Sequence, residues 1–309
     1  MIDKQSKIFI AGRNGLVGSS IEKALSEKGY KNIIGLRSKE LDLREQAVVV
    51  DYFEQEKPEY VILAAAKVGG IKANIERPAE FLYDNLMIQN NIIHNAYKSG
   101  VKKLLFLGSS CIYPRLAPQP MKEEYLLDGK LEPTNEGYAI AKIAGLKMCK
   151  NYNQQYDTDF ISVMPCNIYG LGDNFDPNES HVVAALIRKF HESKVSDQTY
   201  VDIWGTGNAR RELLFNEDLA DACVFLFESY SGNEFLNIGT GEDVSIKELA
   251  YLIKSIVDFQ GDVRFDSSKP DGMPQKLLNV EKIHKIGWKH KTSLEDGIRR
   301  TYEWFLKSL

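Results

Sequence analysis

The chain has 309 residues, of which 43% are hydrophobic, and this length suits about two ordinary globular domains with sizeable cores. Its formal net charge is −4, and charges of both signs are mixed along the chain. This pattern argues against broad electrostatic capture of nucleic acid or of an acidic membrane surface, so an anionic ligand must be bound by local positive charge.

Short apolar runs alternate with amphipathic stretches through the first half of the chain. The runs predict buried parallel strands at residues 7–12, 32–37, 60–65, 103–108 and 159–164. The stretches between them predict helices near 16–28, 44–56, 78–98 and 136–156. A further helix is predicted at 216–228 and an apolar strand at 235–239. This alternation predicts an α/β fold with a doubly wound parallel sheet, which binds ligands at the carboxyl ends of its strands.

The first predicted strand runs into Gly12-x-x-Gly15-x-x-Gly18, and helical sequence follows at once. Glycines at this spacing allow a tight turn, so that the backbone approaches a pyrophosphate at the positive end of the helix. A plain glycine turn between core elements is the alternative interpretation. Because the motif lies in the first strand–helix unit, we expect dinucleotide contacts from Gly12, Gly15, Leu16, Val17 and Gly18.

The second predicted strand ends in positive residues, whereas NAD-selective sites usually have an acidic residue there. Arg37 offers a planar fork, Lys39 a point charge and Ser38 a hydroxyl, which together favour the 2′-phosphate of NADP(H). Solvated surface charge is the alternative, because Glu40 and Asp42 follow closely. Asp42 is also a candidate contact for the adenosine end of the cofactor.

We therefore expect residues 1–170 to form an NADP-binding Rossmann domain, which about 214–240 would rejoin. The strand–helix rhythm breaks at 167–177, where turn-forming residues are frequent. Residues 171–213 and 241–309 are expected to form a smaller substrate-binding lobe.

Three polar residues predict a site that delivers a proton. Tyr138 and Lys142 are four residues apart in a predicted helix, so both project from one face. A free phenol has a pKa of about 10, which a neighbouring ammonium lowers by stabilising the phenolate. Ser109 follows the fourth predicted strand, where its hydroxyl can bind a reacting oxygen. An exposed helix pair and a turn hydrogen bond are the structural alternatives.

Several longer blocks of sequence resemble the extended short-chain dehydrogenase/reductase family, which combines such a glycine loop with Ser, Tyr and Lys. These blocks are Ala64–Ile71, Gly108–Pro114, Glu132–Gly145, Asp173–Phe175 and Lys269–Gly272. They are similar to the members of that family that act on GDP-linked 4-keto-6-deoxy sugars. The resemblance implies conversion of GDP-4-keto-6-deoxy-mannose to GDP-L-fucose, by epimerisation at C3 and C5 and reduction at C4 by NADPH.

Inversion of a carbon beside a ketone requires a base, and an acid that returns a proton on the opposite face. The resemblance implies that Cys111 is the base and His181 the acid, which suits a partly ionised thiol and an imidazole. An inert buried cysteine and a structural histidine are the alternatives. The resemblance also implies that Tyr138 protonates the alkoxide at C4, assisted by Ser109, while Lys142 orients this step and holds the nicotinamide ribose.

The same resemblance assigns further contacts. Those to the cofactor are Ala64, Ala66, Leu107, Gly108, Lys142, Pro165, Cys166, Asn167, Ile168 and His181. Those to the substrate are Lys189, Trp204, Arg211 and Asp271. Solvated charge, and core packing in the case of Trp204, are the alternative interpretations.

The chain departs from the family at three places: Arg13-Asn14 replaces a usual His-Arg, Lys189 a usual Arg, and Cys166 a usual Thr. The nearest alternative function is therefore C4 reduction of a related GDP-4-keto-6-deoxy sugar, such as a heptose, with little or no epimerisation. A non-catalytic NADP-sensing or scaffold protein is the alternative from another class. A homodimer is expected from the family, with 78–98 and 136–156 as the candidate interface helices.

The four cysteines show no Cys-x-x-Cys spacing, so reduced thiols in a cytoplasmic setting are expected. The first residues lack the apolar core and cleavage site of a signal peptide, and no run approaches the roughly 20 apolar residues that span a bilayer. We expect a cytoplasmic protein with no metal site and no membrane or nucleic-acid partner.

Overall fold

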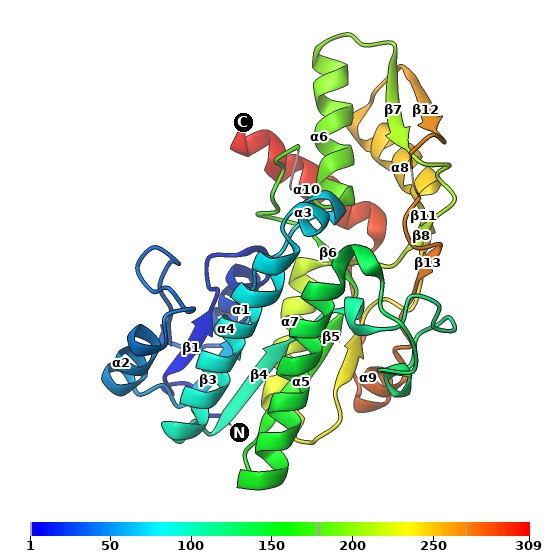
Figure 1. Cartoon of the computed structure of the whole chain (residues 1–309). Helices are drawn as coiled ribbons and strands as arrows, with labels where there is room; N and C mark the ends of the chain where they lie inside the picture. The colour runs from blue at the N-terminus through cyan, green and yellow to red at the C-terminus, as the bar shows by residue number, and fades with distance from the viewer. Residues whose placement is uncertain (1, 178–179, 270) are drawn as a thin grey trace.

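The computed structural model describes residues 2–177, 180–269 and 271–309. Its centre is a parallel six-stranded sheet with the strand order β10-β5-β4-β3-β1-β2 (Figure 1). The strands are β1 (Ile8–Ala11), β2 (Ile33–Ile34), β3 (Tyr60–Leu63), β4 (Lys103–Leu107), β5 (Phe160–Pro165) and β10 (Leu236–Ile238). The predicted α/β fold with a doubly wound parallel sheet is confirmed.

The central strands are mostly apolar because helices cover both faces of the sheet. Every residue of β4 and β5 is buried. One helical layer contains α1 (Leu16–Glu27) packed on α7 (Asn216–Ser229). The other contains α2 (Gln46–Glu56), α4 (Pro78–Lys98) and α5 (Glu136–Tyr156), which lie in front of the sheet in Figure 1. In the described part of the chain, no helix is both long enough and apolar enough to cross a membrane.

The predicted strand at 32–37 is wrong in its length, because only Ile33 and Ile34 pair with β1. The chain leaves the sheet at Gly35, where a Cβ would lie 2.7 Å from the carbonyl oxygen of Ile10. The strand predicted at 235–239 does join the sheet, as β10 beside β5. The short helix α3 (Ile71–Glu76), which follows β3, was not predicted.

Helix α9 (Glu281–Ile286) packs on β10 beside the sheet. Most of the other elements lie beyond the carboxyl ends of the strands, in the upper part of Figure 1, and we call them the upper elements. The helices are α6 (Val182–Val195), α8 (Ile246–Val257) and α10 (Leu294–Ser308). The strands are β7 (Tyr200–Trp204) paired with β12 (Asp262–Asp266), and β8 (Arg210–Arg211) between β11 (Val244–Ser245) and β13 (Gln275–Lys276). These elements share a second hydrophobic core that includes Ile187, Phe190, Ile203, Leu249 and Phe305. The exact limits of the two domains stay a prediction.

Two short strands connect the two parts of the chain. β6 (Asn167–Tyr169) follows β5 almost directly and pairs with β9 (Leu213–Phe215), which leads into α7. The polypeptide therefore passes between the central sheet and the upper elements close to the carboxyl end of β5. Residues from both parts meet at the strand ends for this reason.

Candidate active site

The glycine loop between β1 and α1 leaves no room for larger residues. Gly12 has a φ of +87°, and a Cβ there would lie 2.6 Å from the backbone nitrogen of Ala65. A Cβ at Gly18 would lie 2.0 Å from the carbonyl oxygen of Gly12. Gly15 is the N-cap of α1 and has no side chain to cap the first N–H groups, which are therefore open to an anion. These residues fit the pyrophosphate of a dinucleotide.

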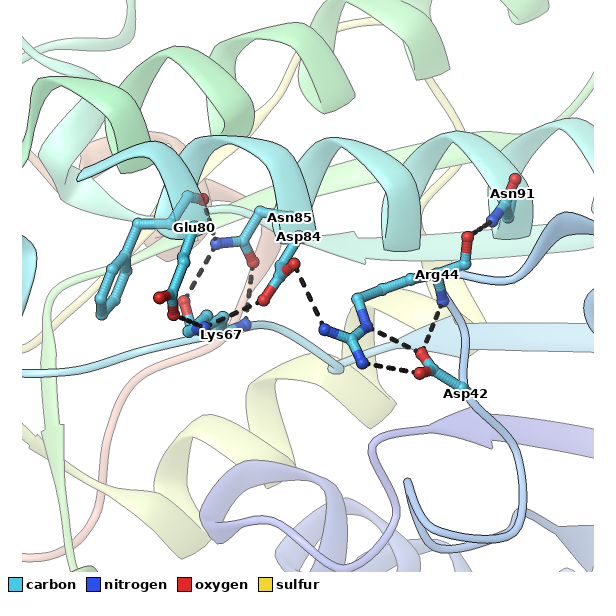
Figure 2. A network of polar contacts seen from close by, with 8 residues as sticks. Asp42, Arg44, Lys67, Glu80, Asp84, Asn85 and Asn91 are labelled. Carbon is cyan, nitrogen blue, oxygen red and sulfur yellow. Dashed lines mark hydrogen bonds and ion pairs between the residues drawn. The ribbon is translucent and has the colours of Figure 1, made fainter. Parts of the chain in front are cut away.

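The residues expected around the adenosine end lie in the loop after β2. The Asp42 carboxylate accepts hydrogen bonds from Arg44 Nε at 2.9 Å and Nη2 at 2.7 Å (Figure 2). These hydrogen bonds from Arg44 lower the pKa of Asp42. Arg44 also reaches Asp84 on α4 at 3.4 Å, and Asp84 pairs with Lys67 at 3.0 Å. Asp42 is thus already bound by Arg44, which the sequence analysis did not single out.

Positive charge for a 2′-phosphate is available at two exposed side chains. Neither Arg37 nor Lys39 forms an ion pair within the described residues, and Ser38 between them is also exposed. Arg13, between the glycines, is instead engaged by Glu22, which accepts from its Nε at 2.7 Å. Arg37 and Lys39 remain the candidates for recognising NADP(H).

Ser109 and Cys111 lie next to each other at the carboxyl end of β4. The chain passes through Gly108 into a single 3-10 turn at Ser110–Ile112, and Ser109 caps that turn. The Ser109 hydroxyl oxygen accepts a hydrogen bond from the Cys111 N–H at 3.2 Å. The capping interaction fixes both side chains at the edge of the sheet where ligands bind.

Tyr138 and Lys142 lie one turn apart near the start of α5. Lys142 is buried, and its Nζ donates to the carbonyl oxygen of Leu107 at 2.8 Å. The same Nζ lies 5.8 Å from the centre of the Tyr138 ring. Burial lowers the pKa of Lys142 to about 8. The predicted face shared by the two side chains is therefore present, at the end of β4.

The expected direction of the Tyr138 pKa is wrong. Burial raises this pKa, the charge of Cys111 raises it further, and a hydrogen bond with Ser109 only partly opposes them. Lys142 does not reverse the shift because its ammonium is directed at the Leu107 carbonyl and burial dominates. Tyr138 is consequently a neutral phenol at neutral pH and can donate a proton.

Two donors contact the sulfur of Cys111. Lys276 Nζ lies 3.2 Å and Asn135 Nδ2 lies 3.3 Å from Cys111 Sγ. Burial raises the pKa of the thiol, but the Lys276 charge and hydrogen bonds from Ser109, Lys276 and Asn135 outweigh burial and leave the pKa lowered. This environment differs from that of an inert buried cysteine.

Neither Lys276 nor Asn135 was among the site residues predicted from the sequence. Asn135 lies inside the Glu132–Gly145 block, so that resemblance could have drawn attention to it. Lys276 is 165 residues from Cys111, and no local spacing in the sequence indicates their contact.

His181 is the N-cap residue of α6, and its side chain does not cap the helix. The residue is exposed, yet enough protein surrounds the imidazole for desolvation to lower its pKa, and the positive charge of Lys276 lowers it further. Lys276 thus acts electrostatically on both residues expected to perform the epimerisation.

The predicted cofactor contacts follow three neighbouring strands. Ala64 and Ala66 follow β3, Gly108 follows β4, and Pro165 to Ile168 run from β5 into β6. Cys166 is buried, and burial followed by the charge of Glu212 raises the pKa of its thiol. Cys166 is therefore a neutral thiol.

The predicted substrate residues come from the upper elements. Trp204, at the end of β7, is 63% exposed, which excludes the core-packing alternative. Asp271 accepts from the N–H and hydroxyl of Thr206 at 2.7 and 2.8 Å. Arg211 Nη1 donates to Met273 O at 2.7 Å, and burial lowers the pKa of Arg211 while Asp271 opposes that shift. Trp204, Arg211 and Asp271 are brought together.

Lys189 lies on α6, and its Nζ donates to the carbonyl oxygen of Asp202 on β7. Burial lowers the pKa of Lys189. Pro270, part of the Lys269–Gly272 block, lies outside the described residues.

Comparison with known proteins identifies the family. The model of the family described as "NAD dependent epimerase/dehydratase family" matches residues 8–239. GDP-L-fucose synthase 1 of Arabidopsis thaliana is 57% identical over 100% of this chain and 96% of its own length. GDP-L-fucose synthase of Escherichia coli (strain K12) is 49% identical over 98% of each chain.

A solved structure is also similar to this chain over its whole length. MlghC, a GDP-mannoheptose C4 reductase from Campylobacter jejuni with NADP bound, is 42% identical and superposes with a TM-score of 0.91 over 99% of this chain and 100% of its own. The chain therefore belongs to the NAD dependent epimerase/dehydratase family, as its resemblance to the extended short-chain dehydrogenases/reductases predicted.

Proposed function

We propose that this protein is a bifunctional enzyme, which epimerises GDP-4-keto-6-deoxy-D-mannose at C3 and C5 and reduces C4 with NADPH to give GDP-L-fucose. The observation that carries this proposal is the Cys111 thiol, whose sulfur has a Lys276 ammonium at 3.2 Å beside the Ser109–Tyr138 pair. A C4 reductase needs no activated thiol, whereas epimerisation needs a base. The two relatives named GDP-L-fucose synthase support the choice of sugar.

The cofactor is NADP(H). The glycine loop and the uncapped start of α1 support pyrophosphate binding, and the positive side chains of Arg37 and Lys39 support the 2′-phosphate. The NADP in MlghC supports the same choice. When bound, NADPH supplies the hydride that reduces C4. Lys142 would then hold the nicotinamide ribose beside Tyr138.

In the epimerisation, Cys111 acts as a thiolate that removes the proton from the carbon beside the ketone. The electron pair of the broken C–H bond moves to the C4 oxygen, which becomes an enolate. His181, in its protonated form, then returns a proton to the opposite face of the carbon. The same pair serves C3 and C5, because both carbons adjoin the C4 ketone.

The C4 oxygen gains negative charge in both parts of the reaction, as an enolate and later as an alkoxide. Ser109 lies close enough to Tyr138 to lower its pKa, and both hydroxyls can donate to that oxygen at both stages. In the reduction, Tyr138 transfers its proton to the alkoxide, and the raised pKa of the phenol keeps that proton in place until it is needed.

The diphosphate and the base would be bound by the upper elements. Arg211 and Lys189 supply positive charge, and the exposed ring of Trp204 supplies an aromatic face. Binding energy from the nucleotide would position the distant sugar carbons against Cys111 and Tyr138.

The test is incubation with GDP-4-keto-6-deoxy-mannose and NADPH in D₂O, followed by NMR of the product. Deuterium is expected at both C3 and C5, because the proton returned to each carbon exchanges with solvent. A reduced product without deuterium at either carbon would sink the bifunctional proposal. Cys111→Ser is the control variant, and it should lose the labelling while NADPH binding is retained.

A C4 reductase of a related GDP-4-keto heptose is the second candidate, because MlghC shares 42% identity with this chain. The comparison of kcat/KM for the two ketones decides between the candidates. A non-catalytic NADP-sensing or scaffold protein would not need Ser109, Tyr138 and Lys142 to lie together.

We also propose a homodimer formed through α4 and α5. Tyr83 on α4 is 61% exposed, and Ile140 and Tyr156 on α5 are each 43% exposed. Apolar and aromatic side chains on adjoining helices would be buried by a second copy.

A further inference from the structure

A positive side chain from the upper elements reaches the proposed base. Lys276 is the last residue of β13, which pairs with β8, whereas Cys111 follows β4 of the central sheet. Their Nζ and Sγ atoms are 3.2 Å apart, although 165 residues separate them in the sequence. The base is therefore assembled from both parts of the chain.

The backbone around Lys276 is held by a buried carboxylate. The Glu212 N–H donates to the Lys276 carbonyl oxygen at 3.1 Å, and Glu212 Oε2 accepts from the Leu278 N–H at 2.8 Å. Gln119 Oε1 accepts from the Leu277 N–H between them at 2.9 Å. Glu212 is completely buried, and these contacts anchor the backbone around Lys276.

The Lys276 ammonium lacks the partner that a half-buried cation needs. Among the described residues, Cys111 Sγ is the acceptor recorded for Lys276 Nζ, and no carboxylate lies within ion-pair distance of it. A cation removed from water is costly unless an anion or strong acceptor compensates it. The thiolate form of Cys111 provides that anion.

Asn135 adds a second argument for the charged thiol. Its Nδ2 donates to Cys111 Sγ at 3.3 Å, while its Oδ1 is buried without a hydrogen-bond partner in the described part of the chain. The amide is thus turned towards the sulfur although its own acceptor stays unsatisfied. Two donors around one sulfur atom suit a thiolate better than a neutral thiol, which is a weak acceptor.

We infer that Lys276 is the positioning residue that makes Cys111 the base, by placing a positive charge 3.2 Å from the sulfur. This inference rests on the proposed function. The charge favours the thiolate of Cys111 and disfavours the imidazolium of His181, so His181 releases its proton more readily to the carbon.

The other charged and titratable groups around this pair do not replace Lys276. Tyr138 from α5 faces Cys111 but is a neutral phenol. Lys142, also from α5, is bound to the Leu107 carbonyl. Glu212 is occupied by backbone N–H groups of Gly241 and Leu278.

The first experiment measures the pH dependence of the reactivity of the Cys111 thiol, in the absence of a sugar substrate. Iodoacetamide labelling of Cys111 is followed by mass spectrometry against pH in the NADP-bound enzyme, for the natural chain, Lys276→Met and Lys276→Arg. In Lys276→Met the labelling midpoint should rise by about one pH unit or more, because a neighbouring cation lowers a pKa by this order. Lys276→Arg should restore most of the shift. Lys247→Met, at an exposed lysine of the same lobe on α8, is the matched control and should change nothing.

The second experiment measures deuterium exchange at C3 and C5 against pH. The acid limb reports ionisation of Cys111 and the basic limb deprotonation of His181, so both limbs should move to higher pH in Lys276→Met. A purely structural loss would lower exchange at every pH. If Lys276 only bound the diphosphate, the KM would rise while both pH profiles stayed in place, which would overturn the inference.

Different results would overturn the proposed function and the inference about Lys276. No exchange by the natural enzyme would overturn the proposed function, and the base and acid roles with it. Normal exchange with an unchanged Cys111 labelling profile in Lys276→Met would overturn this inference alone. NADPH binding serves as the folding control, and Lys276→Gln replaces Lys276→Met if that variant fails to bind NADPH.

Discussion

The Ser109 hydroxyl lies between two acids that must hold opposite protonation states. Burial raises the pKa of both Cys111 and Tyr138, and a hydrogen bond with Ser109 opposes that effect in each. Only Cys111 also has the ammonium of Lys276 beside it, and its pKa ends below the ordinary value. The site therefore combines a thiol of lowered pKa with a neutral phenol, which suits the proposed epimerisation followed by reduction.

Removal of the Tyr138 phenol tests the reducing step. Tyr138→Phe should slow NADPH oxidation by about 100-fold or more, because a positioned general acid contributes this order of rate. NADPH affinity should not change, since the ring and Lys142 remain. Steady-state oxidation of NADPH and a fluorescence titration measure the two effects.

Tyr152→Phe is the matched control for Tyr138→Phe. Tyr152 lies on the same helix, and its hydroxyl contacts His94 Nδ1 at 2.7 Å, away from the strand ends. Equal turnover in Tyr138→Phe and the natural enzyme would refute the assigned role of the phenol.

Arg37 and Lys39 should determine the choice between the two nicotinamide cofactors. Replacement of both by Ala removes two exposed positive charges, so the KM for NADPH should rise about tenfold or more while the KM for NADH stays the same. Lys31→Ala, another exposed lysine close to β2, should have no effect. An equal loss with both cofactors would contradict a role in binding the 2′-phosphate.

At the scale of elements, α4 and α5 approach each other closely because α5 carries glycine at the contact. A Cβ at Gly137 would lie 3.0 Å from the Pro78 carbonyl oxygen, and one at Gly145 would lie 2.8 Å from Gln89 Oε1. Gln89 Nε2 donates to the Ala141 carbonyl oxygen at 2.6 Å and joins the helices further. This close packing supports the proposal that the two helices form a single interface with a second copy.

Charge on that surface should separate the subunits. The double variant Tyr83→Glu with Ile140→Glu should sediment as a monomer, whereas the natural chain should sediment as a dimer, because like charges would face each other across the two-fold axis. Leu116→Glu is the control, since Leu116 is an exposed apolar residue elsewhere on the molecule. A natural chain that sediments as a monomer at micromolar concentration would contradict the proposed interface.

At the scale of the whole molecule, Glu212 joins three segments of the chain. Its carboxylate accepts from the Gly241 N–H, which follows β10, and from the Leu278 N–H, which follows β13, while its own backbone belongs to the segment between β8 and β9. Burial raises the pKa of Glu212 to about 7, although the backbone hydrogen bonds lower it. The upper elements are therefore attached to the sheet through a titratable group.

This group predicts a pH-dependent stability. Its pKa is about 7 in the folded protein and 4.5 in an unperturbed chain, so its stabilisation is complete below pH 4.5 and is lost as the pH rises through 7. The loss amounts to about 3 kcal/mol in the free energy of unfolding. Urea unfolding at pH 5 and pH 8 should show a smaller decline in Glu212→Gln than in the natural chain. Glu242→Gln, at an exposed neighbour, should behave like the natural chain, and equal declines in all three proteins would contradict the prediction.

Local sequence determined most elements and the motifs that they carry. The predicted helices at 78–98 and 136–156 coincide with α4 and α5, because apolar periodicity over about 20 residues is a strong local signal. The glycine loop and Ser109 at the end of β4 were predicted for a similar reason: the order of strand, turn and helix places them at one edge of the sheet.

Only the tertiary structure determined which side chains contact the site residues and which protonation states those residues have. Arg44 reaches Asp84 across 40 residues, and Lys276 contacts Cys111 across 165 residues, and neither contact follows from local spacing. The raised pKa of Tyr138 depends on how deeply α5 buries it, which periodicity does not report. A pKa reflects every charge and dipole within several ångströms, and the folded chain determines which groups those are.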